Sequence, residues 1–523
     1  MNWIIYAMLV VFFGVMIGIG LYCRRHATDV NGFVLGGRAV GPWLTAFAFG
    51  TSYFSAVIFV GYAGQFGWNF GLASTWIGLG NAFIGSLLAW AVLGRRTRIM
   101  TQTLDSRTMP DFFAKRFQSE TMKVVASVIV FIFLIPYTAS LYNGLSSLFN
   151  MAFNLPYWVC ILIMAALTAL YVIFGGYMAT AINDFIQGLI MLIGIVAVIA
   201  AVLVSNGGFT EAVRELSQID AGTGQLGGFT SFVGPQPLAL LFVVVLTSLG
   251  TWGLPQMVGK FYSIKNEDAV KKGTIISTFF AVIVAGGCYF LGGFGRLYAD
   301  RINYSASGSP LFDSIVPTML GTLSPVIIAI VIVLVLSASM STLSSLVLTS
   351  SSTLTLDVIL HASKKKNSEK KQVSIMRVFI VFFIVVSAVI AILKDANPSF
   401  TFIAQMMGVS WGALAGAFLA PFLYGLYWKK TTKAAVWVSF IWGCGLEIFQ
   451  LFYTLGKMSF ANPVLNYIFA SSVRSGAVAM VMGLILVPVV SWLTPKMKKE
   501  DVEPCFVGFD RTVEVAAKRS LGD

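Results

Sequence analysis

A run of hydroxyl side chains lies within a long apolar segment near residue 340 of this 523-residue chain. Ala338, Ser341, Thr342 and Ser345 recur at helical spacing, so they share one helix face. Neutral hydroxyls and free backbone carbonyls can supply the oxygen ligands of a hard monovalent cation such as sodium, without the negative charge that favours a divalent ion. The same stripe is also compatible with hydroxyls that bond back to their own helix or to a neighbour.

Two other apolar segments, 46–55 and 247–256, carry glycine or proline beside hydroxyl residues. Broken backbone is tolerated in lipid only where it lines a protein-enclosed cavity. Interrupted helices at matching positions of two halves therefore indicate a transporter binding site, although glycines also let helices pack closely. Carbonyls freed near Thr51 and Phe54 are placed to complete a cation's shell. The expected helix breaks are Gly50, Gly250, Gly253 and Pro255.

Two carboxylates are further candidates for a function inside the membrane. Asp184 precedes about twenty apolar residues and is either a helix-start carboxylate at the interface or a functional group. Glu447 lies in the twelfth apolar segment, outside the two sets of five helices described below.

The composition requires lipid as the solvent of these segments. The chain is 57% hydrophobic and 11% charged, its mean hydropathy is +0.83, and soluble domains are about 25% charged. We expect an all-α polytopic membrane protein with about thirteen spans, each of roughly 20 apolar residues. The expected spans are 3–23, 42–66, 72–94, 122–147, 156–176, 183–204, 237–256, 273–295, 323–347, 374–393, 399–427, 433–453 and 468–494.

The net charge of +13 reflects topology rather than a nucleic-acid partner. Basic residues gather in alternate loops, which is typical of the cytoplasmic side. The N-terminus is then outside and the C-terminus inside, and the polar tail after Pro495 is expected to be mobile. The basic loops hold Arg24, Arg25 and Arg38, then Arg95 to Arg116, Lys260 to Lys272, Lys364 to Lys371, Lys429 to Lys433, and the tail from Lys496.

Other kinds of site find no support in the residue pattern. The five cysteines are far apart and the two histidines lie beside basic loops, so we expect no disulfide framework and no metal other than sodium. No nucleophile, base and acid set is present, so we expect neither an enzyme nor an organic cofactor.

Several short motifs together resemble the sodium:solute symporter family over nearly the whole chain, most closely its sodium/proline and sodium/pantothenate branch. The motifs are Gly36-Gly37-Arg38 with Gly41-Pro42, Gly175-Gly176 with Asn183-Asp184 and Gln187, and Met340-Ser341-Thr342-Leu343-Ser344. The resemblance implies a leucine-transporter-like inverted repeat of five plus five helices, with one extra helix before and two after. The implied units are 1–40, 41–205, 206–430, 431–495 and a cytoplasmic tail, 496–523.

The resemblance also implies ligands. One sodium site would use the carbonyls of Thr51 and Phe54 with Ala338, Ser341 and Thr342. Some family members have a second sodium site, which here would use Asp184, Ser341, Ser344 and Ser345. The implied substrate-binding residues are Tyr53, Ser55, Gln65, Tyr137, Trp252, Gln256 and Gln405.

Two features bear on the solute. Proline transporters carry an aspartate where this chain has Tyr53. No arginine or lysine is expected mid-membrane in the cavity, so a substrate carboxylate would meet half-helix N-termini and neutral donors.

The function expected from residues and resemblance is sodium-coupled import of a small organic solute across the plasma membrane by alternating access. The solute would be a proline-like amino acid, pantothenate or a monocarboxylate. Proton coupling through Asp184 or Glu447 and a channel or sensor remain alternatives. Protein partners and oligomeric state are not predicted.

Overall fold

The computed structural model describes residues 2–24, 27–153, 156–222, 224, 226–305, 308–362, 368–396 and 403–510. These residues form helices and no β-strand, and eleven of their helical segments are long and apolar enough to cross a membrane. The all-α membrane architecture is therefore confirmed. The count of thirteen spans stays a prediction, because α3 (Pro42–Tyr53) has only 12 residues and the apolar piece Tyr157–Leu170 is also short.

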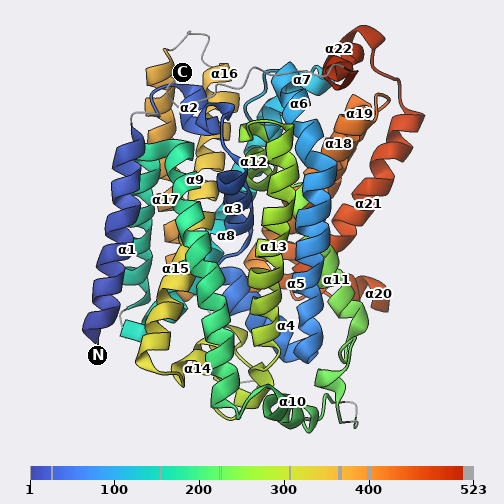
Figure 1. The fold of residues 1–523 in the computed structure, drawn as a ribbon. Coiled ribbons are helices and arrows are strands. Elements are labelled where there is room, and N and C mark those ends of the chain that lie inside the picture. The colour runs from blue at the N-terminus through green and yellow to red at the C-terminus, as the bar shows by residue number, and fades with distance from the viewer. Residues whose placement is uncertain are drawn as a thin grey trace.

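The helices differ in how far they face lipid. Only 22% of the apolar window of α1 (Asn2–Cys23) is buried inside the protein, and α1 lies at the edge of the bundle (Figure 1). The corresponding share is 78% for the span that contains α15 (Pro325–Thr353) and 89% for α18 (Ile403–Tyr427). Polar side chains on α15 and α18 are therefore shielded from lipid.

The first half of the chain contains a sharp change of direction in its longest helix. Besides α1, α3 and several short helices at the ends of the bundle, it includes α4 (Ala63–Phe70), α5 (Thr75–Ala82), α6 (Arg95–Thr103), α8 (Glu120–Phe153) and α9 (Tyr157–Ser205). α9 turns at Gly176, whose φ of 55° favours glycine. A Cβ at Gly176 would also lie 2.9 Å from the carbonyl oxygen of Phe33.

The second half supplies the remaining long helices. They are α11 (Pro237–Leu249), α12 (Pro255–Ser263), α13 (Glu267–Gly292), α15, α17 (Glu369–Ala396), α18, α19 (Lys433–Leu455) and α21 (Ser472–Leu493). The short helix α3 packs against α9, α12, α13 and α15. Both interrupted segments thus lie within the bundle, and the division into two repeats stays a prediction.

Glycines bring α4 and α5 into backbone contact with α13. A Cβ at Gly67 would lie 2.0 Å from the carbonyl oxygen of Gly292, and a Cβ at Gly292 would lie 2.1 Å from that of Ala63. About two helical turns closer to the start of α13, a Cβ at Gly78 would lie 2.6 Å from the Cα of Gly286. Real Cβ atoms do not approach so closely, so side chains are excluded at Gly67, Gly78 and Gly292, which together form a glycine seam.

Several short helices lie at the two ends of the bundle (Figure 1). One end carries α2 (Val30–Leu35), α7 (Met109–Phe117) and α22 (Lys499–Asp510). The opposite end carries the N-terminus, α10 (Phe209–Ser217), α14 (Ile315–Gly321) and α20 (Pro463–Phe469). Of the basic loops used to predict topology, Arg25 and residues 364–366 lie outside the described residues, as does the chain beyond residue 510.

The polar tail contains a packed helix rather than the mobile segment that we expected. Val502 and Phe506 of α22 are buried, and the guanidinium of Arg116 lies 5.0 Å from the Phe506 ring centroid. An ion pair of 2.7 Å joins Lys429 to Glu503. Burial lowers the pKa of Arg116 to about 10, so this arginine stays cationic at neutral pH. A few apolar residues at helical spacing outweigh the polar composition of the tail.

Candidate functional site

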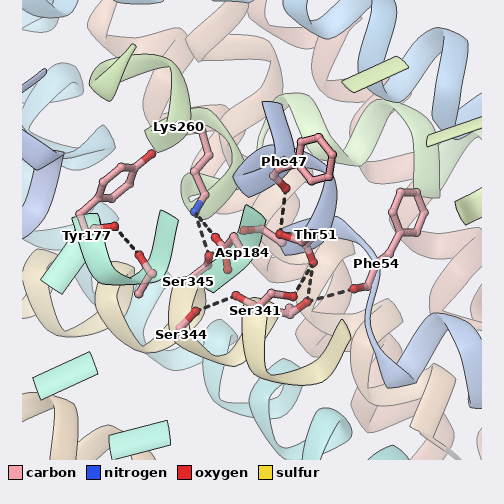
Figure 2. A network of polar contacts seen from close by, with 12 residues as sticks. Phe47, Thr51, Phe54, Tyr177, Asp184, Lys260, Ser341, Ser344 and Ser345 are labelled. Atoms are coloured by element: carbon pink, nitrogen blue, oxygen red, sulfur yellow. Dashed lines mark hydrogen bonds and ion pairs between the residues drawn. The ribbon is translucent and has the colours of Figure 1, made fainter. Parts of the chain in front are cut away.

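The first interrupted helix opens four residues after the glycine that was expected to break it. α3 ends at Tyr53, and Phe54 is extended, with φ −99° and ψ 121°. The carbonyl groups of Thr51 and Phe54 face α15 (Figure 2). Gly50 lies inside α3, where a Cβ would come 2.5 Å from the Phe280 ring. Gly50 therefore permits close packing against α13 instead of ending the helix.

The second interrupted helix changes course over several residues. α11 ends at Leu249, a 3₁₀ turn covers Gly250–Trp252, and Leu254 is extended before Pro255 begins α12. A Cβ at Gly253 would lie 2.8 Å from the Cα of Ala415, so this glycine allows the break to press against α18. The backbone groups of the turn are enclosed by protein, as a break inside lipid requires.

Five oxygen atoms from α3 and α15 meet beside the first break (Figure 2). The Ser341 hydroxyl oxygen lies 3.1 Å from the Thr51 carbonyl oxygen and 3.0 Å from that of Ala338. The Thr342 hydroxyl oxygen lies 3.2 Å from the Thr51 oxygen, 3.4 Å from the Phe54 oxygen and 3.0 Å from the Ala338 oxygen. All five residues are buried.

Two-centre hydrogen bonds alone do not account for this cluster of five oxygen atoms. Two hydroxyl groups carry two protons, and a carbonyl carries none. At most two of the five close contacts can therefore be two-centre hydrogen bonds, and the others share a hydrogen atom in a three-centre bond or bring lone pairs together. A cation at the centre would stabilise all five oxygens.

The spacing of these oxygens also suits a cation shell. Calcium, a cation bound by the same kinds of oxygen atom, has ligands at about 2.4 Å, so neighbouring ligands at right angles lie about 3.4 Å apart. The longest observed separation, between the Thr342 hydroxyl and the Phe54 carbonyl oxygens, equals that value, and the other four are slightly shorter, at 3.0 to 3.2 Å. Neutral oxygens without a carboxylate favour a monovalent ion over a divalent one.

The residues nominated for a second ion meet an unexpected lysine. The Lys260 ammonium lies 3.7 Å from a carboxylate oxygen of Asp184 and 2.9 Å from the Ser345 hydroxyl oxygen (Figure 2). The Ser344 hydroxyl donates to the Ser341 carbonyl of its own helix at 2.9 Å. The expectation that Lys260 belongs to a loop is therefore wrong, because Lys260 is buried in the last turn of α12. α12 continues past the break and carries Lys260 into the bundle.

Three aromatic rings converge where the two interrupted helices approach each other. Trp411 of α18 stacks on Tyr53 at a centroid distance of 5.6 Å and meets Tyr137 of α8 edge-on at 6.0 Å. A Cβ at Gly250 would lie 3.2 Å from the Trp411 ring. Ser55 is buried at the first break. The structure thus gathers Tyr53 and Tyr137 beside one tryptophan, with Ser55 next to Tyr137.

The other nominated substrate residues are more dispersed. Trp252 donates its indole N–H to the Ile84 carbonyl at 3.0 Å. Gln256 is buried and lines a cavity of about 50 Å³ together with Lys260. Gln65 of α4 and Gln405 of α18 are partly buried and do not line that cavity. Their part in solute binding stays a prediction.

Trp411 and Lys260 were both missed by the sequence reasoning. No local signal pointed to Trp411, because the flanking Gly408 and Gly412 lie against Ser472 and Glu447 and not against its ring. For Lys260 the signal was its place only five residues after Pro255, which is too few to reach a loop if a new half-helix starts there.

We expect Tyr53→Phe to destabilise the protein without altering its affinity for sodium. The Tyr53 hydroxyl donates to the Thr247 carbonyl at 2.5 Å and so joins α3 to α11. Its loss costs about 0.5 to 1.5 kcal/mol and should lower the melting temperature of the purified protein. Tyr142→Phe is the control, because the buried Tyr142 hydroxyl has no hydrogen-bond partner in the described structure. Equal melting temperatures for both variants would contradict the expected role.

Comparison with known proteins agrees with this arrangement. The family model described as "Sodium:solute symporter family" matches residues 33–443. The osmoregulated proline transporter OpuE of Bacillus subtilis is 29% identical over 474 residues, covering 90% of this chain and 93% of that protein. The sodium/proline symporter of Staphylococcus aureus is 28% identical over 509 residues, covering 95% and 94%.

A solved structure supports the fold. The substrate-bound outward-open state of a Na⁺-coupled sialic acid symporter superposes with a TM-score of 0.72 at 16% identity, covering 95% of this chain and 99% of that one. The leucine-transporter-like fold is thereby confirmed. The relatives are transporters and not enzymes, and sodium-coupled symport of a small solute by a multi-pass plasma-membrane protein is supported. The chain belongs to the sodium:solute symporter family.

Proposed function

We propose that the coupling sodium ion binds among the carbonyl oxygens of Thr51, Phe54 and Ala338 and the hydroxyls of Ser341 and Thr342. The observation that carries this proposal is the surplus of close oxygen contacts over available protons. Because the ligands come from both α3 and α15, ion binding joins the interrupted helix to its neighbour. Sodium then orders the break at Phe54 and raises the affinity for the solute.

The proposed solute is a small carboxylate-bearing molecule of the proline type. Two relatives named as proline transporters, which share over 90% of their length with this chain, support it. The site adds a flat aromatic surface formed by Tyr53, Tyr137 and Trp411. Pantothenate or a short monocarboxylate is the second candidate, because Tyr53 replaces the aspartate of proline transporters and a solute without an amine needs no such partner.

The proposed orientation places the N-terminus outside and the end that carries α7 and α22 in the cytoplasm. This end holds α6, which starts at Arg95, α7, which contains Arg116, and α22, whose Glu503 pairs with Lys429. That agrees with the excess of basic residues expected in cytoplasmic loops. A cavity of about 50 Å³ lies between Arg107 at this end and Lys260 within the bundle. We assign this cavity to the inward route by which ion and solute leave.

The experiment that tests these assignments is uptake by the purified full-length protein in liposomes. An inward sodium gradient should drive uptake of one compound from a labelled panel of proline, other amino acids, pantothenate and short monocarboxylates. Replacement of sodium by potassium should abolish that uptake, and protein-free liposomes give the background. Uptake that ignores sodium and collapses with a protonophore would overturn sodium coupling and favour a proton cycle through Asp184 or Glu447. Uptake of pantothenate or a monocarboxylate alone would replace the proposed solute.

A further inference from the structure

We propose that the ammonium group of Lys260 is a built-in cation that takes the place of a second sodium ion, so that one sodium accompanies each solute. The inference rests on the sodium site proposed above. It concerns the oxygens of Asp184 and Ser345, which would otherwise be ligands for another ion. Nothing in the sequence motifs indicated that these oxygens already had a cationic partner.

The ammonium is held as an ion would be held. Its contacts are the Asp184 carboxylate at 3.7 Å and the Ser345 hydroxyl oxygen at 2.9 Å. The Tyr177 ring centroid lies 5.3 Å away, within the range of a cation–π contact. The Lys260 side chain is only 4% exposed and that of Asp184 is 0% exposed. A carboxylate, a hydroxyl and an aromatic face thus enclose the positive charge.

Charge balance leaves no place for sodium beside this lysine. The two carboxylate oxygens of Asp184 receive no hydrogen bond among the described residues, so Lys260 is the cation that neutralises the buried carboxylate. A sodium ion on the same oxygens would put two positive charges beside one negative charge in a buried site, where repulsion is poorly screened. The ammonium and a second sodium ion therefore exclude each other.

The lysine is also tied to the elements that form the first sodium site. Ser345, which accepts from Lys260, shares a contact of 2.6 Å with the Ser52 hydroxyl. Ser52 neighbours Thr51, whose carbonyl belongs to the proposed site. The Lys260 ammonium contacts Ser345 of α15 and is linked through Ser345 to Ser52 of α3. Because Lys260 is a covalent part of α12, this cation cannot leave the site as a sodium ion would. This cation supports the site during the cycle but is not transported.

The same position is reachable from one end of the protein. Lys260 and Ser345 line the cavity of about 50 Å³ that extends to Thr108. If the ammonium is removed, a hydrated ion has a route to Asp184. A neutral residue at position 260 should therefore convert the position into a second sodium site, since the unpaired carboxylate would then demand a cation.

The test is to count ²²Na⁺ ions bound per polypeptide in the purified full-length protein, which requires no knowledge of the solute. We expect about one ion for the wild type and for Lys260→Arg, which keeps the charge. Lys260→Met should bind about two, and the sodium dependence of binding should steepen. Lys260→Met/Asp184→Asn removes both charges and should return the count to about one.

Each possible ion count either supports or overturns the proposed role of Lys260. Two ions on the wild type, or a folded Lys260→Met that binds one, would overturn the inference while leaving the first sodium site intact. No ion on the wild type would instead overturn the sodium site itself. If Lys260→Met is too unstable to purify without sodium, two measurements replace its ion count. One is the number of ions bound by the wild type, and the other is the rise in the melting temperature of Lys260→Met in sodium compared with choline. Failure of sodium to rescue it would count against the inference.

Discussion

The Ser341→Ala/Thr342→Ala double variant should need at least about 100-fold more sodium for half-maximal uptake than the wild type. Each hydroxyl facing a charged group contributes about 1.5 to 3 kcal/mol, and 1.4 kcal/mol corresponds to a factor of ten in affinity. Both hydroxyls contact the Thr51 carbonyl across the α3–α15 interface, so their loss removes two ligands at once. The measurement is initial uptake rate against sodium concentration in liposomes.

The matched control for this variant lies on the same helix. Ser351 and Thr353 are buried in α15 and donate to carbonyls of their own preceding turn, Ser351 to Val347 at 2.7 Å. Ser351→Ala/Thr353→Ala therefore removes the same atoms without touching the five oxygens of the proposed sodium site, and it should keep the wild-type sodium concentration for half-maximal uptake. Because Thr353 lines the cavity assigned to the release route, the comparison uses this concentration and not the maximal rate. Equal shifts in both double variants would show that α15 is merely destabilised, and no shift in either would exclude the proposed ligands.

Gly292→Ala should be the more damaging of two otherwise identical substitutions in α13. Its new Cβ would lie 2.1 Å from the Ala63 carbonyl oxygen, where backbone rather than a flexible side chain must move. Overpacking typically costs about 1 to 3 kcal/mol, and a clash against backbone belongs at the upper end of that range. We expect a clearly lower melting temperature in detergent and a lower yield of monodisperse protein.

Gly286→Ala provides the comparison for this steric effect. It is also in α13, two turns before Gly292, but its Cβ would meet nothing within 4 Å. Alanine has the higher helix propensity, so Gly286→Ala should be neutral or slightly stabilising. Similar melting temperatures for the two variants would mean that α4 and α13 separate easily, against the close packing described for the glycine seam.

The sequence was sufficient for the membrane architecture, the family and the coupled transport of a small solute, because these depend on long apolar segments and on motifs in order. It was less informative about where a helix opens. The second break lies between Gly250 and Pro255, two residue types that favour a break. The first occurs at Phe54, which has no such preference, and Gly50 serves packing instead. Tertiary contacts decide such positions, so local propensity could not find them.

The environment of single polar residues was also beyond the sequence. Lys260 was assigned to a loop because hydropathy treats a lysine after an apolar segment as its end. The structure shows that it is buried against Asp184, a residue 76 positions earlier in the chain. Trp411 likewise gains its importance from Tyr53 and Tyr137, which come from other helices. Pairings between distant segments leave no trace in one sequence.

The buried pair of Lys260 and Asp184 has a consequence for how steeply this protein can concentrate its solute. If one sodium ion crosses per cycle with a solute of no net charge, a membrane potential of 100 mV contributes about 2.3 kcal/mol, which equals an accumulation of roughly 50-fold at 1.4 kcal/mol per decade. A second ion would square that factor. A fixed lysine therefore lowers the attainable gradient but spares the cell one sodium ion per molecule imported. Such a transporter suits a solute that is taken up in quantity rather than scavenged from traces.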